Sequence, residues 1–312
     1  AQHTEALRRY LSTGEANILG QRVEIGALRA DGSEIPVELA VTEARIEGVP
    51  VFSAYVRDIR SRLEAQAALV EAGERYAHIA RTLQASLLPP VLPAIPGAEV
   101  ASVYRAAGEG IDVGGDFYDV FQLSADQWGV ALGDVMGKGS EAAAVTALAR
   151  YTLRAAAVRP GSRPAAVLRD LNDAINRHDT DRFCTVVYAS LRVGAKSSLT
   201  IASGGHPPVL IRTAGGTGAL SGDGMLLGPF PEWKGNERQV DLDRGDMIVF
   251  YSDGIVEARR GDDLFGTERL MALLDANPTL DADDTVSLIE RSVVEFADSP
   301  NDDMAVVAIR LN

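Results

Sequence analysis

The sequence predicts an α+β protein built in layers, with a smaller β-rich segment and a connecting helix in front of it. Beyond residue 98, strand-like and helix-like patterns occur in blocks and do not alternate regularly. This order favours a layered sandwich over a doubly wound parallel sheet. The 312 residues exceed one domain of ordinary size, and a hydrophobic content of 46% is enough to fill real cores. We therefore expect two domains.

Residues 1–60 are predicted to form a helix followed by three antiparallel strands. The apolar residues Ile35, Val37, Leu39 and Val41 alternate with Glu34, Glu38 and Thr42, which is the pattern of a half-buried strand. Asp31-Gly32 and Glu47-Gly48 mark the turns, because tight hairpin turns need residues that accept positive φ. The third strand is expected at Val51 to Val56.

Two motifs in this segment resemble a known sensor family. The stretch Arg29-Ala30-Asp31-Gly32-Ser33-Glu34-Ile35-Pro36-Val37-Glu38, followed by Val56-Arg57-Asp58-Ile59, is similar to the C-terminal half of a PAS domain. The early strands and helices that complete a PAS ligand pocket are missing from the resemblance. A working sensor and a small β-rich dimerisation piece therefore both remain open for residues 1–60.

Residues 61–90 are expected to form a linker helix. A heptad-like apolar stripe runs along it, and Pro89-Pro90 ends it. The stripe consists of Leu63, Ala67, Val70, Ala77, Ala80, Leu83 and Leu87. The helix could pack on its neighbours or form a parallel coiled coil that joins two protomers. We favour the coiled coil, and with it a homodimer, because the helix lies between a sensor-like and a catalytic-looking domain.

The third segment, residues 91–312, carries the predicted sandwich. Strands are expected at 98–104, 128–135, 184–193, 199–202, 209–212, 247–251 and 304–311, and a further strand is expected to open at Gly114-Gly115-Asp116. Helices are expected at 140–157, 163–178, 268–275 and 284–296.

The composition excludes several classes of partner. A formal charge of −14 disfavours nucleic acid and anionic membrane surfaces, since phosphate backbones are recognised by basic surface. The single cysteine, Cys184, permits no internal disulfide and no cysteine-based zinc cluster. We expect a cytoplasmic protein, with no membrane-spanning stretch and no signal peptide. Because the chain begins at Ala1 without methionine, we also expect it to be a segment of a longer protein.

Four aspartates in short, glycine-flanked motifs are the main functional signal. They are Asp116 in Gly114 to Asp119, Asp134 in Gly133 to Gly139, Asp253 in Tyr251 to Gly254, and Asp302 in Asn301 to Met304. Three of them follow or open a hydrophobic run, so a fold could bring them together. Buried carboxylates require a partner or a metal, and carboxylates without histidine or cysteine suit Mg²⁺ or Mn²⁺. Two such ions about 3.5–4 Å apart are the usual apparatus for phosphate-ester hydrolysis.

Each motif has a simpler interpretation when it is taken singly. A turn with a capping aspartate explains any one of them. Gly114-Gly115-Asp116 also begins the diguanylate cyclase signature, but Phe117 stands where an acidic residue is needed. Residues 133–139 could be mistaken for a P-loop, but the glycine spacing is one residue short and Gly139 replaces the serine or threonine. The backbone carbonyl of Val135 could add an oxygen ligand to a metal.

Taken together, the motifs resemble the metal-dependent serine/threonine phosphatases of the PPM (type 2C) family, in its SpoIIE/RsbU branch. The resemblance covers roughly residues 81–311 and implies an α-β-β-α sandwich. It is carried by Leu83 to Pro89, Val113 to Asp119, Gly133 to Gly139, Ser203-Gly204-Gly205-His206-Pro207-Pro208, Ser252 to Ala258, and Asp302-Asp303-Met304. The combination is also similar to the PAS–phosphatase part of an actinobacterial multidomain sigma-factor regulator.

The resemblance implies roles for the site residues and two ions, Mn²⁺ or Mg²⁺. Asp134 would bridge both metals. Asp116 and the Val135 carbonyl would complete one site, and Asp253 and Asp302 the other. Asp119 and Asp303 are secondary candidates, and Asp303 stands where the wider family often has asparagine.

The chain also departs from the wider family. None of its four histidines lies in a motif that matches the histidine acid of eukaryotic type 2C enzymes. His206 is expected to be a structural turn residue, and Ser203 stands where relatives often carry asparagine. Lys138 is either a phosphate contact or a solvated residue at a helix start.

By this resemblance, the predicted reaction is hydrolysis of phosphoserine or phosphothreonine on a protein by a metal-bound water. The expected substrate is a phosphorylated anti-anti-sigma protein of the STAS fold, with an anti-sigma kinase in the same pathway. The two helices after Gly139 are implied to act as a switch that completes the metal site. The alternative is a pseudophosphatase or scaffolding sensor that binds partners without turnover.

Overall fold

The computed structural model describes residue 10 and residues 19–106, 113–178, 180–297 and 302–312. The chain divides into two compact units, Ala1–Arg75 and Tyr76–Asn312. Most of the helix expected at the start of the chain lies outside the described residues. The division falls inside a long helix, α2 (Arg60–Leu87), and the three-segment plan of residues 1–60, 61–90 and 91–312 stays a prediction.

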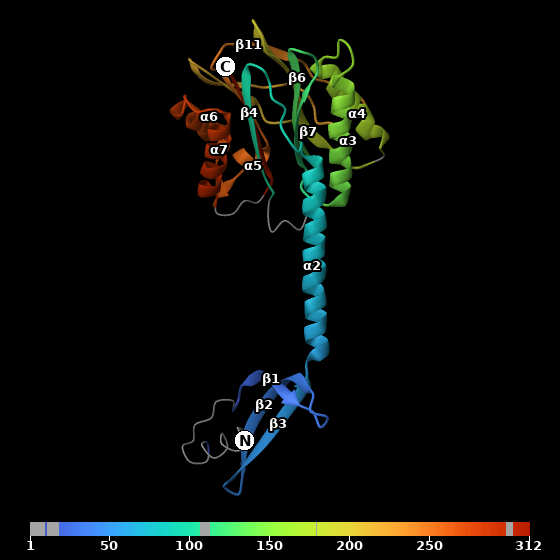
Figure 1. Cartoon of the computed structure of the whole chain (residues 1–312), viewed down its shortest axis with the longest axis vertical. Helices are drawn as coiled ribbons and strands as arrows, with labels where there is room; N and C mark the ends of the chain where they lie inside the picture. Colours follow the sequence, from blue (N-terminus) through green and yellow to red (C-terminus); the bar gives the residue numbers. More distant parts are fainter. Residues whose placement is uncertain (1–9, 11–18, 107–112, 179, 298–301) are drawn as a thin grey trace. The chain divides into compact units, whose positions relative to one another are not determined.

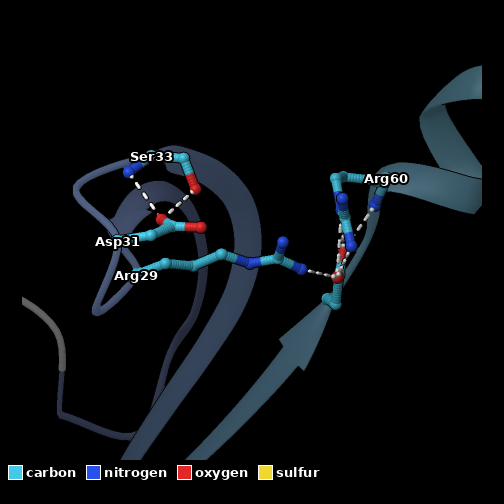
Figure 2. A network of polar contacts seen from close by, with 5 residues as sticks. Arg29, Asp31, Ser33 and Arg60 are labelled. Atoms are coloured by element: carbon cyan, nitrogen blue, oxygen red, sulfur yellow. Dashed lines mark hydrogen bonds and ion pairs between the residues drawn. The ribbon is translucent and has the colours of Figure 1, made fainter.

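The first unit contains the three expected strands as one antiparallel sheet in the order β1-β2-β3 (Figure 1). The strands are β1 (Arg22–Leu28), β2 (Glu34–Ile46) and β3 (Val49–Asp58). Gly32, Glu47 and Gly48 all adopt positive φ, as the predicted turns require. Ser33 donates from both its amide and its hydroxyl to Asp31, which closes the first turn (Figure 2).

Asp58 marks the passage from β3 into α2. It accepts hydrogen bonds from the amide and the guanidinium of Arg60 at 2.8–3.1 Å, and Arg29 approaches to 3.8 Å (Figure 2). The hydrogen bonds from Arg60 lower the pKa of Asp58 to about 2. The carboxylate thus satisfies one of the free amides at the start of the helix.

The second unit contains two five-stranded sheets in which every strand pairing is antiparallel. One sheet has the order β10-β9-β12-β15-β4 and the other β11-β8-β7-β6-β5. The first comprises β4 (Ala98–Arg105), β9 (Val209–Thr213), β10 (Gly216–Leu220), β12 (Met247–Tyr251) and β15 (Met304–Leu311). The second comprises β5 (Asp116–Gln122), β6 (Gln127–Val135), β7 (Cys184–Arg192), β8 (Ser197–Gly204) and β11 (Arg238–Leu242).

Helices cover the outer face of each sheet and complete four layers (Figure 1). α3 (Ser140–Ala157) and α4 (Pro164–Arg177) pack on β5 to β8. α6 (Gly266–Ala276) and α7 (Ala282–Phe296) pack on β4, β9, β10 and β15. A separate apolar core lies between the two sheets, so the α-β-β-α prediction is confirmed.

The strands and helices predicted for the sandwich are all present, with bounds that differ by a few residues. β10, β11 and the small hairpin of β13 (Arg259–Arg260) and β14 (Asp263–Leu264) were missed because they are short and mostly exposed. The single-turn helix α5 (Asp253–Val256) was read as a turn. None of the helices in the described part of the chain is both long and apolar enough to cross a bilayer.

Strand β5 carries one buried aspartate toward each of its faces. Phe117 and Phe121 belong to the core under α3, whereas Tyr118 and Val120 belong to the core between the sheets. Because side chains alternate along a strand, Asp119 faces α3 and Asp116 faces the other sheet. Asp119 accepts hydrogen bonds from two arginines of α3, Arg150 at 3.0 Å and Arg154 at 2.5 and 2.7 Å.

This ion-pair network also reaches the end of α2. Arg150 donates to the carbonyl of Ser86, and Leu87 is buried against Val113 and Ala143. The last residue of the predicted linker stripe is therefore used for packing within the second unit.

Replacing Asp119 with asparagine is expected to cost about 3–5 kcal/mol of stability, because the buried Arg150 would lose its countercharge. Chemical denaturation of the full chain, followed on the transition of the second unit, measures this cost. Asp126→Asn, an exposed carboxylate beside the β5–β6 turn, is the matched control and should cost less than about 1 kcal/mol. Equal stability of the two variants would contradict the role of the network.

Candidate active site

Two of the four motif aspartates are direct neighbours across one strand pair. Asp116 opens β5 and is the cross-strand partner of Asp134, near the end of β6. Directly opposed residues in an antiparallel pair place their side chains on the same face, about 4.5–5.5 Å apart at Cβ. The pairing register alone therefore brings two carboxylates together.

The third carboxylate comes from the opposite sheet. Asp253 is the first residue of α5, immediately after β12 and Ser252. One carboxylate oxygen from each of Asp116, Asp134 and Asp253 lies within 4.8 Å of the other two. The sandwich thus brings three of the four motif aspartates together at one end of both sheets.

Asp302 stands at the rim of this cluster. Its side chain is 59% exposed, just before β15, and lies 3.7 Å from the amino group of Lys138. It belongs outside the tight group of three, although its charge contributes to raising the pKa of both Asp134 and Asp253.

Gly115 allows two oxygens to lie side by side. A Cβ atom at this position would be 2.2 Å from the Val135 carbonyl oxygen and 2.4 Å from Oδ1 of Asp134. No side chain fits there, so the carbonyl and the carboxylate line one concave surface against the glycine backbone. A set of clustered carboxylate and carbonyl oxygens is the donor chemistry that Mg²⁺ and Mn²⁺ prefer.

The electrostatics of the cluster favour a bound cation. Burial, followed by the charge of Asp134, raises the pKa of Asp116 well above its usual range. Burial, followed by the charge of Asp253, raises the pKa of Asp134 to about 7. The pKa of Asp253 is raised by burial and by Asp302. A divalent ion would remove this repulsion, because opposite charge stabilises the ionised form.

The turn after Asp134 is held on both sides by one distant segment. Phe183 accepts a hydrogen bond from the amide of Met136, and Arg182 donates to the Met136 carbonyl at 2.6 Å and to Glu141 at 3.0 Å. A Cβ at Gly137 would lie 2.2 Å from the Arg182 guanidinium. Sequence analysis missed Arg182, because it lies in the connection between α4 and β7 and carries no motif of its own.

The secondary candidates occupy different positions. Asp119 is bound by arginines on the far face of β5, outside the cluster. Asp303 is buried against Gly114, where a Cβ atom would clash with its carboxylate and with the Tyr104 hydroxyl. Its charge contributes to raising the pKa of Asp116.

His206 is buried next to the site. Burial lowers its pKa to about 3, which favours the neutral ring. Ser203 and His206 close their shared turn through two hydrogen bonds of 3.2 Å, in agreement with the expected structural role.

Comparisons with known proteins agree with this fold. The family model described as Stage II sporulation protein E (SpoIIE) matches residues 124–312, which is more than half of the chain. Phosphoserine phosphatase RsbU of Bacillus subtilis (strain 168) is 27% identical over 236 residues, covering 74% of this chain and 69% of that protein.

Solved structures show the same architecture. The RsbU and RsbW domains of Rv1364c from Mycobacterium tuberculosis align with a TM-score of 0.60 and 29% identity, over 71% of this chain and 62% of that chain. The SiaA-PP2C domain of Pseudomonas aeruginosa aligns with a TM-score of 0.65 and 21% identity, over 79% and 98%. A more distant neighbour, the catalytic domain of the serine threonine protein phosphatase PstP, was crystallised with 2 manganese ions; its TM-score is 0.50 at 16% identity, over 69% and 98%.

The second unit has the fold of a PP2C-type phosphatase, and its relatives are phosphoserine and serine/threonine phosphatases. The chain belongs to the SpoIIE family. The predicted family and class of enzyme are thus confirmed.

Without metal, the chain is expected to lose stability as the pH rises. Asp134 has a pKa of about 7 in the folded protein, whereas an unfolded aspartate titrates near about 3.9. Between these values the folded state holds more protons, so the free energy of unfolding falls with rising pH. Melting temperatures in EDTA from about pH 5 to about pH 8 should decline, and Asp134→Asn should flatten the decline. A melting temperature that rises over this range in the wild-type chain would contradict the assignment.

Proposed function

We propose that the chain is a metal-dependent protein phosphatase that hydrolyses phosphoserine or phosphothreonine. The observation that carries this proposal is the meeting of three carboxylates from two sheets within 4.8 Å of one another. Their raised pKa values mean that the protein concentrates unfavourable negative charge at one place. Such perturbation is typical of functional sites.

The residues present fit two hard divalent ions, Mn²⁺ or Mg²⁺. In this proposal Asp134 would be shared by both ions, Asp116 and the Val135 carbonyl would hold one of them, and Asp253 and Asp302 would hold the other. When bound, such ions lower the pKa of a water ligand from 15.7 to about 7 and neutralise charge on the phosphoryl group.

The chain's own residues hold this site in shape. The β5–β6 register fixes Asp116 opposite Asp134, and Arg182 fixes the turn that carries the Val135 carbonyl. Lys138, partly exposed and beside Asp302, is placed to attract an anionic phosphate to the rim. Positioning and preorganised charge are the main contributions that a protein makes to phosphoryl transfer.

We further propose a phosphorylated anti-anti-sigma protein of the STAS fold as the substrate, with an anti-sigma kinase in the same pathway. The similarity to RsbU and to a chain that joins RsbU and RsbW domains supports this proposal. The chain has a formal charge of −14, so a substrate with a strongly acidic surface would be repelled by it.

We also propose that two copies of the chain form a homodimer through α2. Leu63, Val70 and Leu83 of the predicted stripe are exposed, and so are Leu69 and Tyr76. Exposed apolar residues repeated at seven-residue intervals on one helix are the signature of a coiled-coil seam.

The test of the enzyme is phosphate release from an aryl phosphate and from a phosphoserine peptide, with and without Mn²⁺. Asp134→Asn and Asp253→Asn are expected to lower kcat by more than about 10³-fold. Without the metal ligand, no ion would neutralise the phosphoryl charge or lower the pKa of the attacking water. Asp126→Asn, away from the site, should retain full activity. Full activity in either site variant would contradict the metal assignment. Metal binding without turnover would favour a pseudophosphatase.

The test of the dimer is sedimentation of the wild-type chain beside a Leu63→Glu, Val70→Glu variant. Charge in a coiled-coil seam opposes association, so the variant is expected to be monomeric at concentrations where the wild type dimerises. Glu71→Gln, an exposed position on the same helix, is the control. Unchanged association would exclude this face of α2 as the seam.

A further inference from the structure

His206 lies where the chain crosses from one sheet to the other, at the end that carries the site. It follows β8, whose last residue, Gly204, pairs with Val186 of β7. It precedes β9, which pairs with β12. On the β7 side, the next residue toward the site is Thr185, the cross-strand partner of Asp134. On the β12 side, Tyr251 precedes Asp253 by two residues.

The His206 side chain is hydrogen-bonded to β7, and its backbone leads directly into β9, the neighbour of β12. Its Nδ1 atom is 2.8 Å from the Thr185 hydroxyl. Burial lowers the pKa of the ring, and a backbone hydrogen bond with Tyr251 partly opposes this lowering. The ring is 8% exposed, and Nε2 is buried with no hydrogen bond of ordinary geometry. Thr185 is therefore the side-chain partner on which the ring depends.

The backbone of His206 is equally constrained. Its amide donates to Ser203 Oγ, and its carbonyl accepts from the same hydroxyl. Gly205 has a φ of +73°, and the preceding Gly204 bonds to the segment at Gly224 through a short bridge. Ser203 and Gly205 thus fix the direction in which the histidine leaves the turn, and Pro207-Pro208 then restrict the exit.

We infer that His206 is a positioning residue for the metal site, which ties β7 to β12 and so sets the spacing between Asp134 and Asp253. This inference rests on the proposed metal site. Asp134 belongs to the β7 sheet and Asp253 follows β12 in the other sheet, so a shift between the two strands changes the distance between the two carboxylates. Two carboxylates that repel each other need such a tie, because their own interaction would drive the strand ends apart.

The inference separates His206 from a catalytic acid. A neutral ring that is buried under the strand ends holds its neighbours by hydrogen bonding and packing. Loss of the ring should weaken metal binding, whereas loss of an acid should change the pH dependence of turnover.

The experiment measures Mn²⁺ affinity of the full chain by titration calorimetry, with kcat and KM on an aryl phosphate. His206→Ala and Thr185→Val are expected to weaken Mn²⁺ binding by about tenfold, the lower end of effects seen for groups that support metal ligands. At subsaturating Mn²⁺, kcat should fall with KM unchanged, and the shape of the pH profile should stay the same. His206→Asn keeps a hydrogen-bonding group close to the Nδ1 position and should recover most of the affinity.

The matched control lies at the opposite end of β12. Asp246 is buried before Met247 and accepts a hydrogen bond from the Asp243 amide at 2.9 Å, so Asp246→Asn perturbs the same strand far from the site. It should lower the melting temperature without changing Mn²⁺ affinity. A folded His206→Ala chain with wild-type affinity, or an equal loss in Asp246→Asn, would overturn the positioning role alone.

Two further outcomes complete the test. If His206→Ala does not fold, Thr185→Val decides the question, because it keeps the ring and removes only its hydroxyl partner. If the wild-type chain binds no Mn²⁺, the proposed function fails together with the inference.

Discussion

The organising constraint in this structure is the mutual repulsion of carboxylates that the fold forces together. Asp116 and Asp134 face each other across a strand pair, and Asp253 reaches them from the second sheet. Burial and like charge raise the pKa of each. A hydrogen bond from Ser252 to Asp116 and the charge of Lys138 near Asp134 oppose this repulsion only in part, and a divalent cation would neutralise it.

Much of the local sequence supports the arrangement of these carboxylates. Because Gly115 has no side chain, the Val135 carbonyl and the Asp134 carboxylate can both lie against its backbone. Gly254 likewise leaves room for the backbone carbonyl of Asp303. Arg182 holds the turn after Asp134 from a loop 46 residues away. His206 is hydrogen-bonded to Thr185 of β7, the cross-strand partner of Asp134. Each of these residues helps to keep the segments that carry the carboxylates close together.

Strand β5 shows how one element can carry a structural and a functional carboxylate. Asp119 points toward α3, where two arginines neutralise it, and the network extends to Ser86 at the end of α2. Asp116, three residues earlier, points between the sheets, where its neighbours are other carboxylates. Asp119 stabilises the packing of α3 on one face of the strand, whereas Asp116 is a candidate metal ligand on the other. The two aspartates differ in role because the pleat of the strand points them into opposite environments.

The sequence by itself determined the layers, the main elements and the three carboxylates that meet, because hydrophobic periodicity and glycine-flanked aspartates are local signals. It could not separate Asp302 at the rim from the inner three, nor assign Asp119 to its arginines. Those outcomes depend on strand register and on which helix covers which face. Arg182 and Thr185 carry no motif, and their roles arise only when distant segments are packed together. Tertiary structure alone decided them, since a hydrogen bond across 46 residues leaves no periodic trace in the chain.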